Sequence, residues 1–95
     1  MTESELLAAV RAVAWRCGWL TYHTHRSDRS EPGFPDLCMV RGGRVVFAEL
    51  KSEKGRVTRA QQTWLDGLEQ AGMEVFVWRP SDLDGIARLL SRRVS

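Results

Sequence analysis

The sequence predicts one α/β domain in which helices flank a mixed central β-sheet. Apolar residues recur at helical spacing near both ends of the chain and again in residues 58–71, whereas short runs rich in β-branched and aromatic residues lie between these segments. The expected order is helix, strand, β-hairpin, helix, strand, helix, over a single domain of residues 1–95. A strand that follows a crossover helix should return parallel to the strand before it, whereas hairpin strands are antiparallel. The sheet is therefore mixed, and the helices cover it.

Capping boxes predict where the first two helices begin. Thr2 and Glu5 have the spacing of one box, and Thr58 and Gln61 have the spacing of another. Ser81 is expected to cap the final helix. The apolar positions expected to face the core are Leu6, Leu7, Val10, Val13, Ala14 and Cys17 in the first helix, Trp64, Leu65, Leu68 and Ala71 in the second, and Leu83, Ile86, Ala87 and Leu90 in the third.

A hairpin is predicted from two apolar runs, residues 37–40 and 45–48, with Gly42 and Gly43 at the turn. In that register the numbers of directly opposed residues sum to 85, so Asp36 lies opposite Glu49. Their Cβ atoms should then be roughly 4.5–5.5 Å apart. Lys51 points to the same side as Glu49, because side chains alternate along a strand. Two carboxylates and an amine at one place suit a divalent cation and an activated water.

The same charges have a purely structural reading. Asp36 could be a turn residue that follows Pro35, and Glu49 and Lys51 could lie on a solvated edge strand. Glu49, however, follows the continuous apolar run of residues 45–48, which is typical of a strand buried on both faces. A charge that follows such a run needs a partner. This argument favours a functional site.

Composition indicates a globular protein with one modest core. Hydrophobic residues make up 43% and charged residues 27% of the 95, and the net charge of +2 permits a polyanionic partner without requiring one. Cys17 and Cys38 are expected to be buried reduced thiols, because no zinc-ligand spacing joins them to His23 and His25. No leader peptide or run of about 20 apolar residues is evident, which predicts a cytoplasmic protein without membrane contact.

Pro35-Asp36, followed after twelve residues by Glu49-Leu50-Lys51, resembles the PD-(D/E)xK nuclease signature. The flanking residues resemble its VRR-NUC branch, the virus-type replication and repair nucleases. These flanking residues are Gly33, Phe34, Leu37, Phe47, Ala48, Gly55, Arg56, Thr58, Gln61, Trp64 and Leu65. The resemblance extends from Glu3 to about Leu90. It implies a restriction-endonuclease-like core and a stand-alone nuclease domain of the phage or prophage type.

The resemblance also implies a metal-dependent active site without an organic cofactor. Asp36, Glu49 and the backbone carbonyl of Leu50 would bind one or two Mg²⁺ or Mn²⁺ ions, which favour oxygen ligands. Lys51 would orient the attacking water or steady the developing charge. Gln61 would position the water or the phosphate, and the alternative is that it serves only as a capping partner.

A glutamate of the first helix helps to bind metal in this family. Glu3 matches that position better than Glu5, which already has a capping role. The alternative for Glu3 is a favourable interaction with the helix dipole alone.

Two charged segments are the expected phosphate contacts. Arg26 and Arg29 precede the acid pair, and Lys54, Arg56 and Arg59 follow Lys51. The alternative for both segments is a solvated surface loop.

These observations predict a Mg²⁺- or Mn²⁺-dependent endonuclease that hydrolyses DNA. The resemblance implies products with 5′-phosphate and 3′-hydroxyl ends. The resemblance to stand-alone members implies a homodimer that acts on branched DNA such as Holliday junctions. Trp15, with Ala8 and Ala12, lies opposite the apolar stripe of the first helix and is the candidate dimer contact, or else a second packing surface. The alternatives are a non-cleaving DNA-binding module on the same fold and a nuclease of general duplex or flap DNA.

Overall fold

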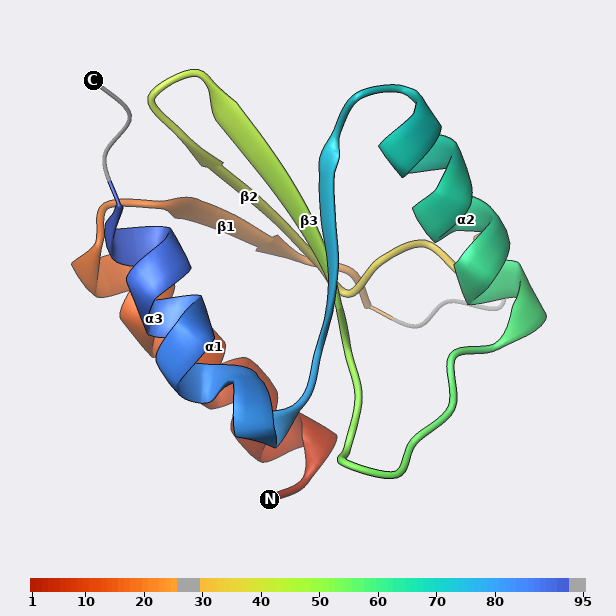
Figure 1. The fold of residues 1–95 in the computed structure, drawn as a ribbon, viewed down its shortest axis with the longest axis horizontal. Helices are drawn as coiled ribbons and strands as arrows, with labels where there is room; N and C mark the ends of the chain where they lie inside the picture. The colour runs from red at the N-terminus through yellow and green to blue at the C-terminus, as the bar shows by residue number, and fades with distance from the viewer. Residues whose placement is uncertain (26–29, 93–95) are drawn as a thin grey trace.

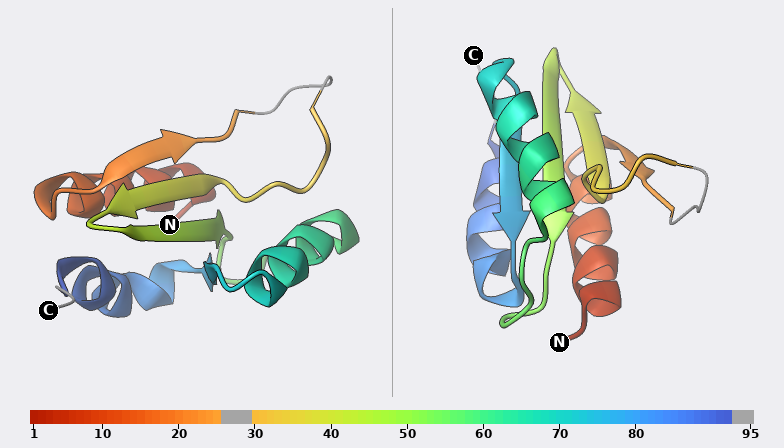
Figure 2. Two further views of the ribbon diagram at one scale, coloured as in Figure 1. Left: turned by 90° about the horizontal axis from the view of Figure 1, so that it is seen from above. Right: turned by 90° about the vertical axis from the view of Figure 1, so that its right-hand side faces the viewer.

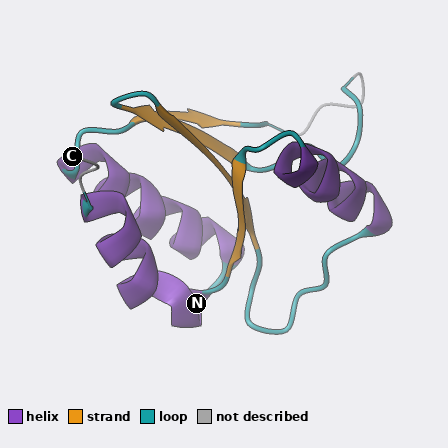
Figure 3. Ribbon diagram, turned by 45° about the horizontal axis from the view of Figure 1, so that its top comes forward, coloured by secondary structure: helices purple, strands orange, loops and turns teal. Residues whose placement is uncertain are grey.

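A four-stranded sheet separates one pair of helices from a third helix in the computed structural model, which describes residues 1–25 and 30–92. The elements are α1 (Glu3–Arg16), β1 (Leu20–His23), β2 (Leu37–Arg41), β3 (Arg44–Leu50), α2 (Arg59–Gln70), β4 (Glu74–Trp78), the 3₁₀ helix η1 (Pro80–Asp82) and α3 (Leu83–Ser91). Helices α1 and α3 lie together on one side of the sheet, and α2 lies on the other (Figures 1, 2 and 3). The predicted fold class and order of elements are confirmed.

The strands follow the order β1-β2-β3-β4, and only the last pair is parallel. Val40 lies opposite Val45 and Cys38 lies opposite Phe47, so the predicted hairpin register is correct. Gly42 and Gly43 have φ angles of 54° and 82°. A two-residue turn of this kind needs positive φ at both positions, which explains why two glycines stand there.

Helices α1 and α2 begin at the predicted capping boxes. The Glu5 carboxylate accepts a hydrogen bond of 2.8 Å from the Thr2 N–H, and the corresponding contact between Gln61 and Thr58 is 2.9 Å long. The predicted cap of the final helix is wrong. The chain first makes η1, in which the Asp82 carboxylate accepts from the Arg79 N–H, whereas Ser81 donates to Glu53.

The main core lies between the sheet and the α1–α3 pair. Its buried residues are Leu6, Val10, Ala14, Trp19, Leu37, Met39, Val46, Ala48, Leu50, Trp78, Ile86 and Leu90. The prediction that Ala71 faces the core is wrong, because α2 ends at Gln70 and leaves Ala71 exposed. Among the described residues, no helix is long and apolar enough to cross a membrane.

One polar arrangement joins the ends of three elements. The Trp19 indole N–H donates to the Leu90 carbonyl at 2.8 Å, and the Arg41 guanidinium lies 4.7 Å from the centre of the Trp19 ring. Arg41 also donates to the carbonyls of Cys17 and Leu90. These contacts satisfy carbonyls at the C-terminal ends of α1 and α3, which lack partners within their own helices. The hairpin and both helices are thereby held together at the end of the sheet remote from the acid pair.

Candidate active site

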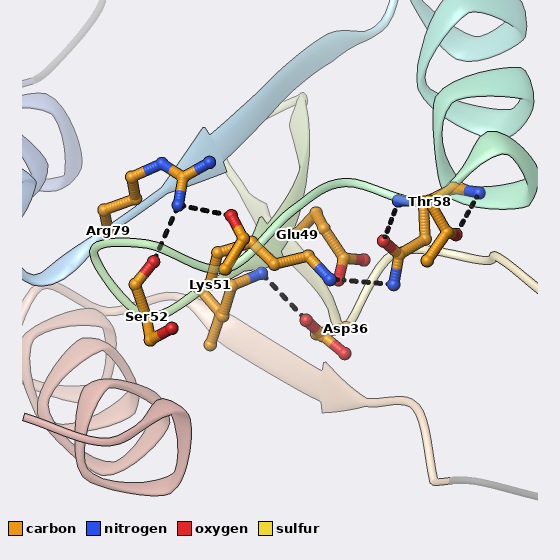
Figure 4. A network of polar contacts seen from close by, with 9 residues as sticks. Asp36, Glu49, Lys51, Ser52, Thr58 and Arg79 are labelled. Carbon is orange, nitrogen blue, oxygen red and sulfur yellow. Dashed lines mark hydrogen bonds and ion pairs between the residues drawn. The ribbon is translucent and has the colours of Figure 1, made fainter.

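The predicted acid pair lies where β2 begins and β3 ends, at the opposite end of the hairpin from its glycine turn (Figure 4). Asp36 comes directly before β2, and its Oδ2 accepts a 2.8 Å hydrogen bond from the Leu50 N–H. This contact fixes the Asp36 carboxylate against the last residue of β3. The hairpin therefore brings Asp36 close to Glu49, although twelve residues lie between them in the sequence.

Glu49 is a buried acid with an incomplete set of partners. It is 2% exposed, and its Oε2 accepts from Gln61 Nε2 at 3.1 Å and lies 3.7 Å from Lys51 Nζ. Its other oxygen, Oε1, is buried and has no hydrogen-bond partner among the described residues. Leaving a buried carboxylate oxygen unpaired costs free energy. This oxygen is the place in the site where a cation would be most favourable.

Burial and, after it, the negative charge of Asp36 raise the pKa of Glu49 to about 8. Lys51 opposes the shift, because its positive charge favours the ionised carboxylate. Glu3 adds a weaker negative contribution. Without a bound cation, the Glu49 carboxyl is therefore mostly protonated at neutral pH, whereas a cation in the site would favour the ionised form.

Gln61 has both of the roles that the sequence left as alternatives. Its Oε1 accepts from the Thr58 N–H, and Thr58 Oγ1 accepts from the Gln61 N–H at 3.2 Å. The same carboxamide donates through Nε2 to Glu49. The capping box therefore fixes the orientation of the amide that contacts the buried acid.

Gly33 brings α2 close to the segment that leads into Asp36. Its φ is +95°, and a Cβ atom there would lie 2.4 Å from the carbonyl oxygen of Ala60. Next to it, the Phe34 ring packs edge-on against Phe47 of β3 and Trp64 of α2, with centroids 5.8 and 5.1 Å apart. These contacts place the first turn of α2, and with it Gln61, beside the end of β3.

A pocket of about 300 Å³ opens between α1 and the start of β2. Its lining residues are Glu3, Ser4, Leu7, His23, Thr24, His25, Asp36 and Leu50. Glu3 therefore lies beside the acid pair, whereas Glu5 is engaged in capping. Within residues 1–25 and 30–92, however, no three His, Cys, Asp or Glu side chains form a group suited to a metal ion.

The sequence analysis assigned no role at this site to His23 and His25. Their ring centroids are 4.9 Å apart, and both side chains line the pocket. Thr24, which lies between them, donates through its N–H to the Asp36 carbonyl and through its hydroxyl to the Pro35 carbonyl. A prediction that paired β1 with β2 would have placed both histidines near Asp36, since His23 lies opposite Leu37.

The predicted phosphate contacts are only partly described. Lys54, Arg56 and Arg59 are exposed on the segment that joins β3 to α2 and at the start of α2. Arg26 and Arg29 lie outside the described residues. The segment with the three exposed cations begins directly after Lys51.

The acid pair offers oxygen donors. Asp36 and Glu49 contribute two carboxylates, and Mg²⁺ is commonly held by one or two carboxylates together with water and substrate phosphates. The unpartnered Glu49 Oε1 fits this chemistry. Carboxylate oxygens are the donors that hard cations such as Mg²⁺ prefer.

The mixed sheet, with an Asp, a Glu and a Lys at the ends of its central hairpin, defines a nuclease-type α/β domain with a restriction-endonuclease-like core. The sequence model of the VRR-NUC domain family matches residues 3–82, and the chain belongs to this family.

Solved structures share the fold. One described as "VRR_NUC domain" superposes with a TM-score of 0.75 at 22% sequence identity, and the match covers 99% of this chain and 100% of that one. Another, described as "VRR_NUC domain protein", has a TM-score of 0.70 at 20% identity, with coverage of 95% and 85%. No curated protein matches the sequence.

Proposed function

We propose that this protein is a Mg²⁺- or Mn²⁺-dependent endonuclease that hydrolyses DNA phosphodiester bonds. The observation that carries the proposal is the environment of Glu49, a buried acid beside Asp36 with one unpartnered oxygen. A purely structural acid at this depth would be expected to have both oxygens paired. A divalent cation between the two carboxylates would remove their repulsion and satisfy the free oxygen.

Each residue of the site has a role in this proposal. Asp36 and Glu49, with the backbone carbonyl of Leu50 and with Glu3 as a further donor, hold the cation. When bound, the cation would act as a Lewis acid on the phosphate and lower the pKa of a water molecule. Lys51 donates to the water or to the phosphate oxygen that gains negative charge.

Gln61 holds the Glu49 carboxylate and presents an amide beside it. Lys54, Arg56 and Arg59 contact the DNA backbone. Arg26 and Arg29, which lie outside the described residues, are the other proposed backbone contacts. Hydrolysis then breaks the bond to the 3′ oxygen and leaves 5′-phosphate and 3′-hydroxyl ends.

A nicking assay tests the proposal. Supercoiled plasmid is incubated with the protein in Mg²⁺, Mn²⁺ or EDTA, and Asp36→Asn and Lys51→Met are compared with Glu74→Gln. Glu74 pairs with Arg44 away from the site, so its variant controls for the loss of a charge. We expect both site variants to lose on the order of 100-fold or more in rate. Wild-type rates in either site variant, or equal cleavage in EDTA, would contradict the assignment.

Metal binding is tested separately from cleavage. Thermal unfolding with and without Mn²⁺ is expected to show stabilisation of the wild type, because a ligand that binds only the folded state stabilises it. Asp36→Asn should show a smaller shift. A protein that binds Mn²⁺ and DNA but never cuts would be the non-cleaving DNA-binding module, which is the second candidate function.

Branched DNA and a homodimer are the finer parts of the proposal, and both are supported by the resemblance to stand-alone members of the family. Labelled four-way junctions, flaps and plain duplexes are cut in parallel under the same conditions. We expect the four-way junction to be cut fastest. Equal rates on all three substrates would favour a nuclease of general duplex or flap DNA.

A further inference from the structure

Arg79 binds the loop that follows Lys51. Its Nη1 donates to the backbone carbonyl of Ser52 at 2.7 Å (Figure 4). The same nitrogen donates to the carbonyls of Glu53 at 3.1 Å and Gly55 at 2.7 Å. Hydrogen bonds from a charged donor are stronger than those between neutral groups. A single guanidinium nitrogen therefore binds three carbonyls of this loop, although Arg79 comes 24 positions after Gly55 in the sequence.

A second set of contacts ties the same loop to the same place. The Glu53 carboxylate accepts from both the N–H and the hydroxyl of Ser81, at 2.5 and 3.2 Å. The Gly55 N–H donates to the Ser52 carbonyl at 3.2 Å and closes the turn. Main-chain and side-chain groups of the loop are thus both attached to the segment that follows β4.

The loop lies against the Lys51 side chain. A Cβ atom at Gly55 would be 3.5 Å from Cδ of Lys51, so Gly55 lies next to the aliphatic part of the lysine. The Lys51 N–H also donates to the Trp78 carbonyl, at the residue directly before Arg79. Lys51 is 8% exposed, and its Nζ lies 3.7 Å from Glu49.

A lysine side chain has four rotatable bonds, and it loses much conformational freedom when it is held in one place. The Lys51 ammonium is attracted to Glu49, and the aliphatic part of the side chain lies next to Gly55. The position of Gly55 depends in turn on Arg79.

We propose that Arg79 is a positioning residue that acts through the loop of residues 52–55 to hold Lys51 against Glu49. The inference builds on the proposed function, because it gives the confinement of Lys51 a catalytic purpose. Arg79 itself touches neither carboxylate of the acid pair in the described structure. Its effect on the reaction is therefore indirect.

The first test measures Lys51 without using nuclease activity. The protein in EDTA is acetylated with the N-hydroxysuccinimide ester of acetic acid, and modification of Lys51 is followed by mass spectrometry, with the α-amino group of exposed Met1 as the internal reference. In Arg79→Met, we expect Lys51 to react several-fold faster than in the wild type. Arg79→Lys should restore slow reaction, because an ammonium can also donate to the three carbonyls.

Two further variants keep this test decisive. Arg44→Met removes another paired arginine, far from the loop, and should leave Lys51 unchanged. Glu53→Gln weakens the tie to Ser81 without altering Arg79, and it should raise Lys51 reactivity to a smaller extent. If Arg79→Met does not fold, Glu53→Gln decides the question. Unchanged Lys51 reactivity in the folded variants would overturn the proposal.

The second test uses a double-mutant cycle in the nicking assay. Arg79→Met should lower kcat about 10-fold, as expected when a catalytic group is displaced, with a smaller change in KM. In a Lys51→Met background the same change should have no further effect. Full additivity would mean that Arg79 acts independently, for example by contacting phosphate, and would overturn the proposal. A wild type that never cuts DNA would refute the proposed function, while the acetylation result would still decide the structural coupling.

Discussion

Glu49 is the residue at which burial and charge conflict most directly. It follows a run of apolar residues on β3 and is almost fully enclosed, yet one carboxylate oxygen has no partner in the described structure. Gln61 and Lys51 satisfy the other oxygen. The free energy that this arrangement costs the metal-free protein can be measured.

The stability of the metal-free protein is expected to fall as the pH rises from about 5 to 8. The pKa of Glu49 is raised from 4.5 to about 8 in the folded state, so over this range the unfolded chain ionises while the folded chain stays protonated. Glu49→Gln removes this linkage and should be more stable than the wild type at pH 8 by roughly 1–3 kcal/mol. Urea unfolding in EDTA at several pH values measures the difference.

Glu74→Gln is a control that should change the stability at pH 8 in the opposite direction. The hydrogen bond and charge of Arg44 lower the pKa of Glu74, so its ionised form stabilises the folded protein at pH values above its unfolded pKa. Replacing it should therefore reduce stability at pH 8. If Glu49→Gln is also less stable than the wild type at pH 8, then ionised Glu49 does not destabilise the folded protein, and the prediction is wrong.

Gln61→Glu separates capping from the contact with Glu49. A glutamate can still accept from the Thr58 N–H, but it loses the donor to Glu49 and adds a negative charge beside it. We expect nicking to fall by on the order of 10-fold or more, because the added charge disturbs the buried acid. Gln62→Glu makes the same chemical change at the next, exposed position. Equal rates in the two variants would mean that Gln61 has no role in the reaction.

At the scale of elements, the local signals were the most reliable. The glycine pair fixed the hairpin register, and two capping boxes located the starts of α1 and α2, because each pattern is formed by residues close in sequence. The predicted cap of α3 was wrong because a distant residue determines the contacts of Ser81. Ser81 has the right local position, but Glu53, 28 residues earlier in the chain, takes both of its donors.

Gly33 links the loop before β2 to α2, and its replacement tests that link. Gly33→Ala would place a Cβ atom 2.4 Å from the Ala60 carbonyl oxygen and 2.8 Å from the Gln61 nitrogen. We expect a loss of roughly 2–4 kcal/mol in the free energy of unfolding. Gly72→Ala has a similar positive φ but open space around it, so only the conformational cost of about 1–2 kcal/mol should remain. Urea unfolding compares the two, and equal losses would mean that the close approach is not maintained.

For the whole molecule, the sequence predicted the fold class. It also predicted that Asp36, Glu49 and Lys51 lie at one end of the hairpin. It did not predict the contacts that surround them. No role was assigned to Arg79 from the sequence, and the histidines were considered only as zinc ligands. Their positions depend on how β1, the loop after β3 and the segment after β4 pack, and no local pattern encodes such distant contacts.

The proposed homodimer would depend on the whole surface, and the described structure offers two exposed apolar regions for it. Trp15 is 80% exposed on α1, with exposed Ala8 and Ala12 beside it. Leu20 and Tyr22 are 75% and 65% exposed on β1, next to Val40, where α2 leaves the sheet uncovered. Small alanines beside a large indole would allow two copies of α1 to approach closely.

We expect Trp15→Glu to convert the homodimer into a monomer, whereas Tyr22→Glu should leave it intact. In a two-fold interface each substitution acts twice, so two indoles are lost and two like charges face each other. Sedimentation and light scattering across micromolar concentrations measure the mass. Dissociation by Tyr22→Glu alone would move the interface to the open face of the sheet, because Leu20 and Tyr22 point to the same side of β1. A wild type that remains monomeric at every concentration would exclude the homodimer, and any junction preference would then have to arise within a single copy of the site.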